Sequence, residues 1–231
     1  MRCEVCGKQS LSKYCMLHDK NQSRLDTEDV PNIFSHIQSR LLEIEREVLN
    51  NKEIQAINRD SKVVFGYGTG VNKIVIIGTA PSMRGGAIAG IPFSSPVSGK
   101  LVNDILLANN VKKEECFISN VCFTGLTDNR SPNEYEIGLC LPYLVEVIKL
   151  IKPRIIILLG NVAKNAFIEE YSIDYSNEFF QTKIAYNYAF NFVSLPHPSF
   201  IIRLNNEKIL LDYKDKFKSV LNAFKDITVK I

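Results

Sequence analysis

Short apolar runs alternate with longer helical patterns from residue 63 onward. Three runs have the length and composition of buried strands: KIVIIG (73–78), CFISNV (116–121) and RIIILLG (154–160). Residues 183–199 add one or two more strands. Helical spacing of apolar residues follows each run. This alternation predicts an α/β fold, a three-layer α/β/α sandwich around a central and mainly parallel sheet.

The expected helices of this domain span 101–110, 133–151, 161–170 and 205–224. Before it, the polar region 21–62 contains one amphipathic stretch, in which Pro31 occupies a position that a first helical turn tolerates. We therefore expect three parts, namely an amino-terminal knuckle (1–20), a helical linker (21–62) and an α/β domain (63–231).

The knuckle carries the pattern Cys-x2-Cys-x8-Cys-x2-His, formed by Cys3, Cys6, Cys15 and His18. Two close pairs of thiolate and imidazole ligands suit a tetrahedral structural zinc site. Such a site has no open position, so we expect it to support folding or to dock a protein partner. The alternative is a tail with incidental cysteines.

Composition places few limits on function. The chain has 231 residues, 45% hydrophobic and 23% charged, and a formal charge of +3, which neither indicates nor opposes a nucleic-acid partner. No apolar run approaches the roughly 18 residues of a membrane span, and no signal peptide is evident. We expect a cytoplasmic monomer with no membrane association.

Three loop segments follow predicted strands. GTAPSMRGGAIAGIPF (78–93) is rich in glycine and proline, Asn120 ends the second strand, and His197 lies between two prolines. Taken singly, each has a plain structural interpretation as a turn or a stiffened loop. Because the carboxyl ends of parallel strands meet at one edge of a sheet, we expect the three segments to line a ligand site together.

These segments together resemble the uracil-DNA glycosylase superfamily, most closely its iron–sulfur families 4 and 5. The similarity covers roughly residues 63–203, in the order found in that family. The matching segments are VVFGYG (63–68), GTAPSMRGGAIAGIPF (78–93), SGKL (98–101), ISNV (118–121), NRSPNEYEIGLCLPYL (129–144), PRIIILLG (153–160) and LPHPS (195–199).

The resemblance implies a pocket that receives a base flipped out of the DNA stack. In it, Phe93 would stack on the base, and the carboxamide of Asn120 would pair with the uracil edge. His197 would donate a hydrogen bond toward O2, where negative charge gathers as the glycosidic bond breaks. The backbone amides expected to hold the uracil are those of Gly78, Thr79 and Ala80.

The resemblance also implies contacts with DNA outside the pocket. Ser98 and Gly99 open a helix and would hold a phosphate at its amino terminus. Pro198, Ser199 and Arg203 belong to a loop that would press into the minor groove where the base has left.

The sequence departs from the family pattern at the cluster ligands. An iron–sulfur cluster of this type needs four thiolates. Cys140 matches one ligand position, whereas the others fall on Thr124, Asn51 and Ile54. We therefore expect no iron–sulfur cluster, with structural zinc in its place. An alternative is a rearranged cluster that uses Cys3, Cys6, Cys122 and Cys140.

A second departure concerns the carboxylate that activates water. Family 4 has Glu at the place of Thr79, and the acidic residue of family 5 aligns with Pro96. Asp128 is the nearest acid in a matching loop, with no geometric reason to assign it a role. With Asn120 and His197 as catalytic residues, the prediction is a DNA glycosylase that removes uracil, or another deaminated base, in base excision repair.

Two alternatives stay open. One is a non-catalytic module with a glycosylase fold that recognises uracil-containing or single-stranded DNA. The other is an unrelated small-molecule α/β enzyme.

Overall fold

The computed structural model describes residues 30–172, 180–186 and 188–225. Its centre is a five-stranded sheet in the order β2-β1-β3-β5-β4. Four strands run parallel, and β4 pairs antiparallel with β5 at one edge. The strands are β1 (Ile74–Gly78), β2 (Phe117–Asn120), β3 (Ile155–Leu159), β4 (Phe180–Ala185) and β5 (Tyr188–Leu195).

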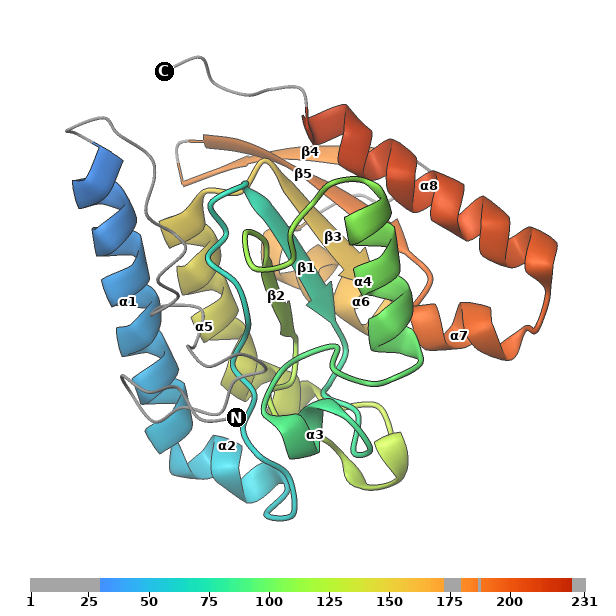
Figure 1. Ribbon diagram of the computed structural model, residues 1–231. Helices are drawn as coiled ribbons and strands as arrows, with labels where there is room; N and C mark the ends of the chain where they lie inside the picture. Colours follow the sequence, from blue (N-terminus) through green and yellow to red (C-terminus); the bar gives the residue numbers. More distant parts are fainter. Residues whose placement is uncertain (1–29, 173–179, 187, 226–231) are drawn as a thin grey trace.

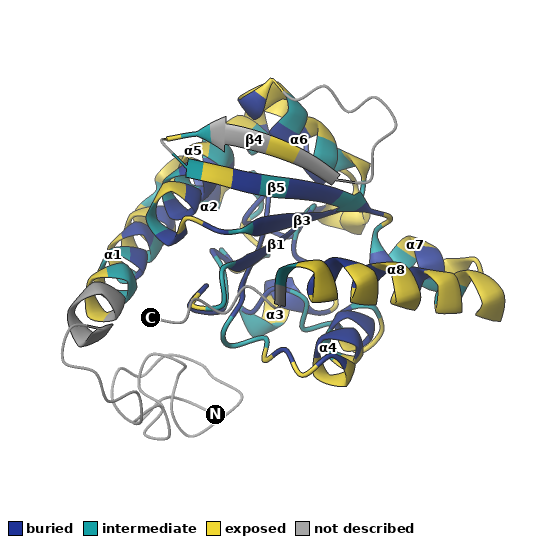
Figure 2. Ribbon diagram, turned by 90° about the horizontal axis from the view of Figure 1, so that it is seen from above, coloured by how far each residue is buried: buried dark blue, intermediate teal, exposed yellow. Residues whose placement is uncertain are grey.

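The central strands are apolar on both faces because each face is covered by helices. In β1, Val75 and Ile77 belong to one core, and Ile74 and Ile76 belong to the other. Figure 2 shows the buried strands between helices whose outer sides are exposed. The expected α/β sandwich with a mainly parallel sheet is confirmed.

Helices α1, α5 and α6 cover one face of the sheet, and α4, α7 and α8 cover the other (Figure 1). Helix α5 begins with a capping box, in which Asn133 and Glu136 each pair with the other's backbone amide. The helices are α1 (Val30–Asn50), α2 (Lys52–Ile57), α3 (Gly86–Ala89), α4 (Ser98–Ala108), α5 (Glu134–Ile151), α6 (Asn161–Tyr171), α7 (Pro198–Arg203) and α8 (Glu207–Lys225), with a 3₁₀ turn at Thr127–Asn129.

The segment expected to be a helical linker packs on the domain. Leu41, Ile44 and Val48 of α1 are buried in the same core as α5, and so is Ile54 of α2. The amphipathic pattern of residues 31–49 predicts a helix but does not indicate which surface its apolar side packs against. Here that surface is α5.

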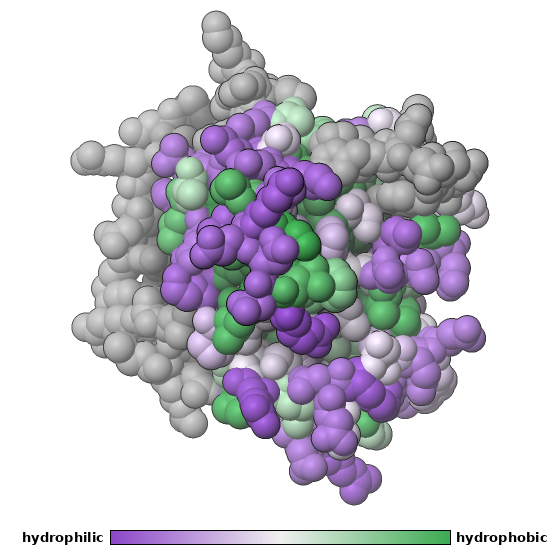
Figure 3. All heavy atoms as spheres, turned by 90° about the vertical axis from the view of Figure 1, so that its right-hand side faces the viewer, coloured by the Kyte–Doolittle hydropathy of each residue, from purple (hydrophilic) through white to green (hydrophobic). Residues whose placement is uncertain are grey.

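Helix α8 buries Tyr213, Phe217, Val220 and Leu221 against the sheet. Four of its lysines, Lys208, Lys214, Lys216 and Lys218, are exposed on the outer side. Figure 3 shows this side of the molecule as largely hydrophilic, with small apolar areas between the polar side chains. None of the described helices is long and apolar enough to cross a membrane.

The predicted zinc ligands Cys3, Cys6, Cys15 and His18 lie outside the described residues. Within the part of the chain that is described, no group of His, Cys, Asp or Glu side chains could hold a metal ion. The zinc site stays a prediction.

Candidate active site

The three loop segments meet at the carboxyl edge of the sheet, where they enclose a small cavity. It measures about 30 Å³, enough for a water molecule but not for a base. A base could therefore enter only if the walls moved apart. The lining residues are Ala80, Ser82, Gly86, Phe93, Ser94, Ser95, Ser98, Asn120 and His197.

Two glycines allow the close approach of these loops. A Cβ atom added to Gly78 would lie 2.6 Å from both Asn120 Oδ1 and Phe93 Cζ. One added to Gly99 would lie 2.0 Å from the carbonyl oxygen of Phe93. Contacts this short are sterically forbidden, so the floor of the cavity requires glycine at both places.

Asn120 ends β2, with its side chain directed into the cavity. The residue is 2% exposed, and among the described residues its Nδ2 has no hydrogen-bond partner. The hydroxyl of Ser94, another lining residue, is also buried and without a partner there. Buried polar groups are nearly always paired in folded proteins, because an unpaired donor costs about 1–3 kcal/mol. These two groups face one cavity, where a water molecule or the polar edge of a ligand can complete them.

His197 is the N-cap of α7, and its Nδ1 accepts a hydrogen bond from the Ser199 amide at 3.2 Å. The Ser199 hydroxyl lies 2.8 Å from the same nitrogen. Because Nδ1 is an acceptor, the proton of the neutral ring lies on Nε2. Burial, helped by the charge of Arg203, lowers the pKa of His197 from 6.5 to about 4. The ring is therefore neutral near pH 7.

Phe93 adopts a left-handed backbone conformation, with φ of 51°. A bulky residue rarely adopts such a conformation, and in folded proteins this strain concentrates at functional sites. Its ring stacks on that of His197, with 6.1 Å between the centroids and 26° between the planes. The strained backbone holds an aromatic face beside the cavity.

No carboxylate lies among the described residues that line the cavity. The Thr79 carbonyl accepts a hydrogen bond from the Cys122 amide, but the residue is outside the lining. Pro96 is exposed, and so is Asp128 in the 3₁₀ turn. The second departure noted in the sequence, the missing loop carboxylate, thus leaves a cavity wall without a general base.

The residues predicted to contact DNA lie around this site. Ser98 is the first residue of α4, but the Gly99 amide already donates to Ser95 Oγ at 3.0 Å. Pro198 and Ser199 begin α7, a short helix where the sequence suggested a loop, and Arg203 ends it in solvent. Their contacts with DNA stay predictions.

Four of the lining residues were not named individually as site residues from the sequence, although Ser82 and Gly86 lie in the 78–93 segment that was expected to line the site. A usable signal preceded α4, since serines shortly before a helical pattern are frequent caps. Ser95 Oγ does accept a hydrogen bond from the Gly99 amide in the first turn of α4, although Val97 occupies the N-cap position. The four residues are Ser82, Gly86, Ser94 and Ser95.

Comparison with known families agrees with this architecture. Residues 65–225 match the model of the uracil DNA glycosylase superfamily. The chain belongs to this superfamily. Three of its curated relatives are type-4 uracil-DNA glycosylases of Pyrobaculum aerophilum, Archaeoglobus fulgidus and Thermotoga maritima.

The similarity to these relatives is moderate. The Pyrobaculum enzyme is 38% identical over 42% of this chain and 48% of its own length. The Archaeoglobus enzyme is 28% identical over 58% of this chain and 66% of its own length. The Thermotoga enzyme is 28% identical over 71% of this chain and 85% of its own length. The chain thus matches about half the length of the first of these relatives.

The superfamily resemblance raised the question of an iron–sulfur cluster, and the residues at three of its four positions do not fit one. Asn51 Oδ1 accepts from the Glu53 and Ile54 amides and caps α2. Ile54 and Thr124 are fully buried. None of the three offers a thiolate, so these positions cannot ligate iron as four cysteines would. The absence of any cluster elsewhere stays a prediction.

Two cysteine thiols close to Thr124 in the sequence, those of Cys122 and Cys140, interact with each other. A hydrogen bond from Cys140 lowers the pKa of Cys122 and raises the pKa of Cys140. The Phe123 amide donates to Cys140 Sγ at 3.4 Å. Both cysteines are fully buried, and Cys140 belongs to the core to which α5 contributes.

We expect that packing, rather than ligation at these positions, holds α2 against α5. Ile54→Ala should lower the free energy of unfolding by about 2–5 kcal/mol, because it leaves a cavity in a close-packed core. Denaturant titration measures this. The control is Arg59→Ala, an exposed change in the turn that follows α2, which should alter stability by less than about 0.5 kcal/mol. Equal effects of the two changes would contradict the assignment.

Proposed function

We propose that this protein is a uracil-DNA glycosylase, which hydrolyses the N-glycosidic bond of deoxyuridine in DNA and so begins base excision repair. The observation that carries the proposal is the unpaired Nδ2 of Asn120, buried in a cavity beside an aromatic face and a neutral histidine. Superfamily membership and relatives named type-4 uracil-DNA glycosylases support it.

Base recognition falls to Asn120 and Phe93. A carboxamide offers one acceptor and two donor hydrogens, which complement the N3–H and O4 groups of uracil. Cytosine presents a donor amine and an unprotonated N3 on the same edge, which a carboxamide turned by 180° would complement. Discrimination against cytosine therefore requires that the fold hold the Asn120 amide in one orientation. Phe93 supplies a flat apolar face for the base. Because a base does not fit the free cavity, its entry requires the walls of the cavity to move apart.

His197 stabilises the leaving group. With Nδ1 held as an acceptor by the Ser199 amide, the donor Nε2–H is available for the uracil O2. As the glycosidic bond breaks, electrons move onto the base, and O2 gains negative charge. A donor already fixed at that point lowers the barrier, and removing such a donor typically costs about 10²–10³ in rate.

The water that attacks the sugar receives weaker assistance, because the described lining contains hydroxyl groups but no carboxylate. Serine hydroxyls hydrogen-bond water but are poor bases. In this proposal, departure of the base is largely dissociative, and water adds late. The same observation favours a second candidate, a non-catalytic module that binds uracil in DNA without cutting.

Excision is tested with purified full-length protein and labelled oligonucleotides carrying one uracil, hypoxanthine or xanthine, in single and double strands. Alkali then cleaves at any abasic site. We expect cleavage at uracil above the other bases. No cleavage at any of the three, with DNA binding retained, would reject the enzyme and favour the binding module.

A further inference from the structure

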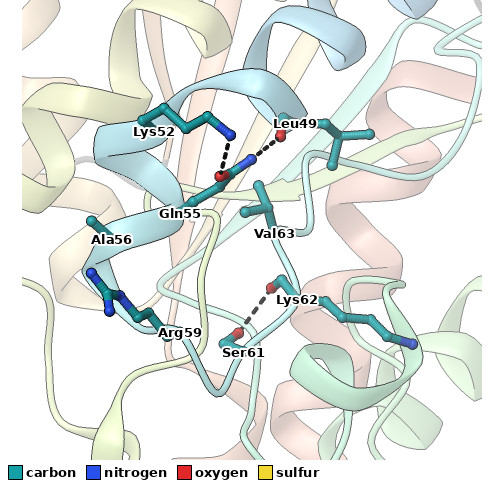
Figure 4. Close-up of a pocket in the computed structure, with 8 residues that line it drawn as sticks. All are labelled: Leu49, Lys52, Gln55, Ala56, Arg59, Ser61, Lys62 and Val63. Carbon is teal, nitrogen blue, oxygen red and sulfur yellow. Dashed lines mark hydrogen bonds between the residues drawn. The ribbon is translucent and has the colours of Figure 1, made fainter.

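A second depression lies on the surface beside α2, separate from the base cavity. It is an open groove of about 730 Å³ formed by the end of α1, by α2 and by the turn that follows (Figure 4). Its lining residues are Leu49, Lys52, Gln55, Ala56, Arg59, Ser61, Lys62 and Val63.

The groove is strongly basic. Lys52, Arg59 and Lys62 lie on three sides of it, and none of the described lining residues is acidic. Lys52 Nζ donates to the neutral Gln55 Oε1 at 3.3 Å. The two nearest acids in the sequence are outside the lining: Asp60 is exposed, and Glu53 accepts from the Tyr135 hydroxyl. The groove therefore presents a positive charge to an anionic ligand.

Hydrogen bonds tie the groove to the loops of the base cavity. The Lys62 amide donates to the Ala87 carbonyl of α3, within the glycine-rich loop. The Gly125 amide, in the loop that follows Asn120, donates to Ser61 Oγ at 2.7 Å. The groove thus lies at the same carboxyl edge of the sheet as the cavity.

The side chain of Lys62 lies between the two depressions. A Cβ atom added to Gly90, at the end of α3, would be 3.6 Å from Lys62 Cδ. Figure 4 shows the Lys62 side chain extending from the groove toward α3. Basic charge thus continues from the groove to the loop that encloses the cavity.

We propose that this groove binds the backbone phosphates of the DNA strand on one side of the excised nucleotide. The proposal rests on the proposed glycosylase function in one respect: that function identifies the anionic ligand as a DNA strand. Because phosphates repeat along the strand at short, regular intervals, a strand leaving the cavity past α3 would meet Lys62 first and the other two cations next. This contact is independent of sequence and positions the strand.

The test compares two charge-matched triple variants of the full chain. The groove variant is Lys52→Gln, Arg59→Gln and Lys62→Gln. The control is Lys214→Gln, Lys216→Gln and Lys218→Gln, exposed residues of α8 on the opposite face of the sheet. Both lose three charges. Fluorescence anisotropy measures binding to an undamaged single strand of about 20 nucleotides over a range of salt concentrations.

We expect the groove variant to bind about tenfold more weakly at low salt, and its plot of log affinity against log salt to be shallower by about 2. The control should bind as the wild type does. Wild-type binding by the groove variant, or equal losses in both variants, would overturn the proposal. Circular dichroism establishes that both variants are folded.

A second measurement separates this proposal from the glycosylase function. Uracil excision is also measured on oligonucleotides truncated on one side of the uracil or on the other. Removing every phosphate on the side that meets the groove should make excision equal in the wild type and the groove variant. Extending the substrate on one side of the uracil should speed excision by the wild type alone. If no protein excises uracil, the glycosylase proposal fails, while the salt dependence still decides the role of the groove.

Discussion

Replacing His197 by alanine is expected to slow uracil excision by about 10²–10³-fold in single-turnover measurements, because the developing charge on O2 loses its donor. Binding of uracil-containing DNA should weaken much less, since the donor acts mainly in the transition state. The control is His36→Ala, an exposed histidine of α1, which should excise at the wild-type rate. A His197→Ala variant with wild-type activity would remove the proposed mechanism.

The low pKa of His197 gives this prediction a pH dependence. With a folded pKa of about 4 against an ordinary value of 6.5, the imidazole stays neutral and competent from about pH 5 upward. The folded state excludes a proton that the unfolded chain accepts. Its contribution to stability is therefore complete above pH 6.5 and lost as pH falls toward 4. His197→Ala should remove this part of the pH dependence of unfolding.

Asn120→Ala is expected to separate activity from stability. Excision should fall by about 10²–10³-fold because the base loses its paired donor and acceptor. The free energy of unfolding should change by less than about 1 kcal/mol, since the free protein already leaves Nδ2 unpaired. Single-turnover kinetics and denaturant titration measure the two effects.

The matched control is Asn109, a buried asparagine at the end of α4 whose Nδ2 donates to the Ile105 carbonyl at 2.7 Å. Asn109→Ala should cost about 1–3 kcal/mol of stability, because it leaves that buried environment unsatisfied, and should not alter excision. If Asn120→Ala were as destabilising as Asn109→Ala, Asn120 would be a structural residue.

The layered fold was readable in the sequence because buried parallel strands require continuous apolar runs. The run that became β1 is apolar on both faces, and only a sheet covered on both sides explains it. The elements that the sequence did not predict are short ones. Helix α2 has six residues, too few for a periodicity to emerge. Helix α7 is capped by His197. The prolines on either side of His197 had suggested that this segment was only a loop.

The base cavity was less accessible to sequence reasoning. Its expected members Phe93, Asn120 and His197 came from three distant segments, and the resemblance to a family, rather than any local pattern, joined them. The unpaired Nδ2 of Asn120 could not be foreseen, because pairing depends on every neighbour in the fold. The basic groove was missed although its residues are close in sequence. Only the fold shows that they line one surface beside the glycine-rich loop.

The measurement that tests the central claim most directly is detection of the free base. Full-length protein is incubated with a molar excess of uracil-containing DNA, and the products are separated by chromatography. The account predicts free uracil and abasic DNA in equal amounts, in excess over the protein, and neither product from a His197→Ala and Asn120→Ala double variant. Stable DNA binding by the wild type without released uracil would contradict it.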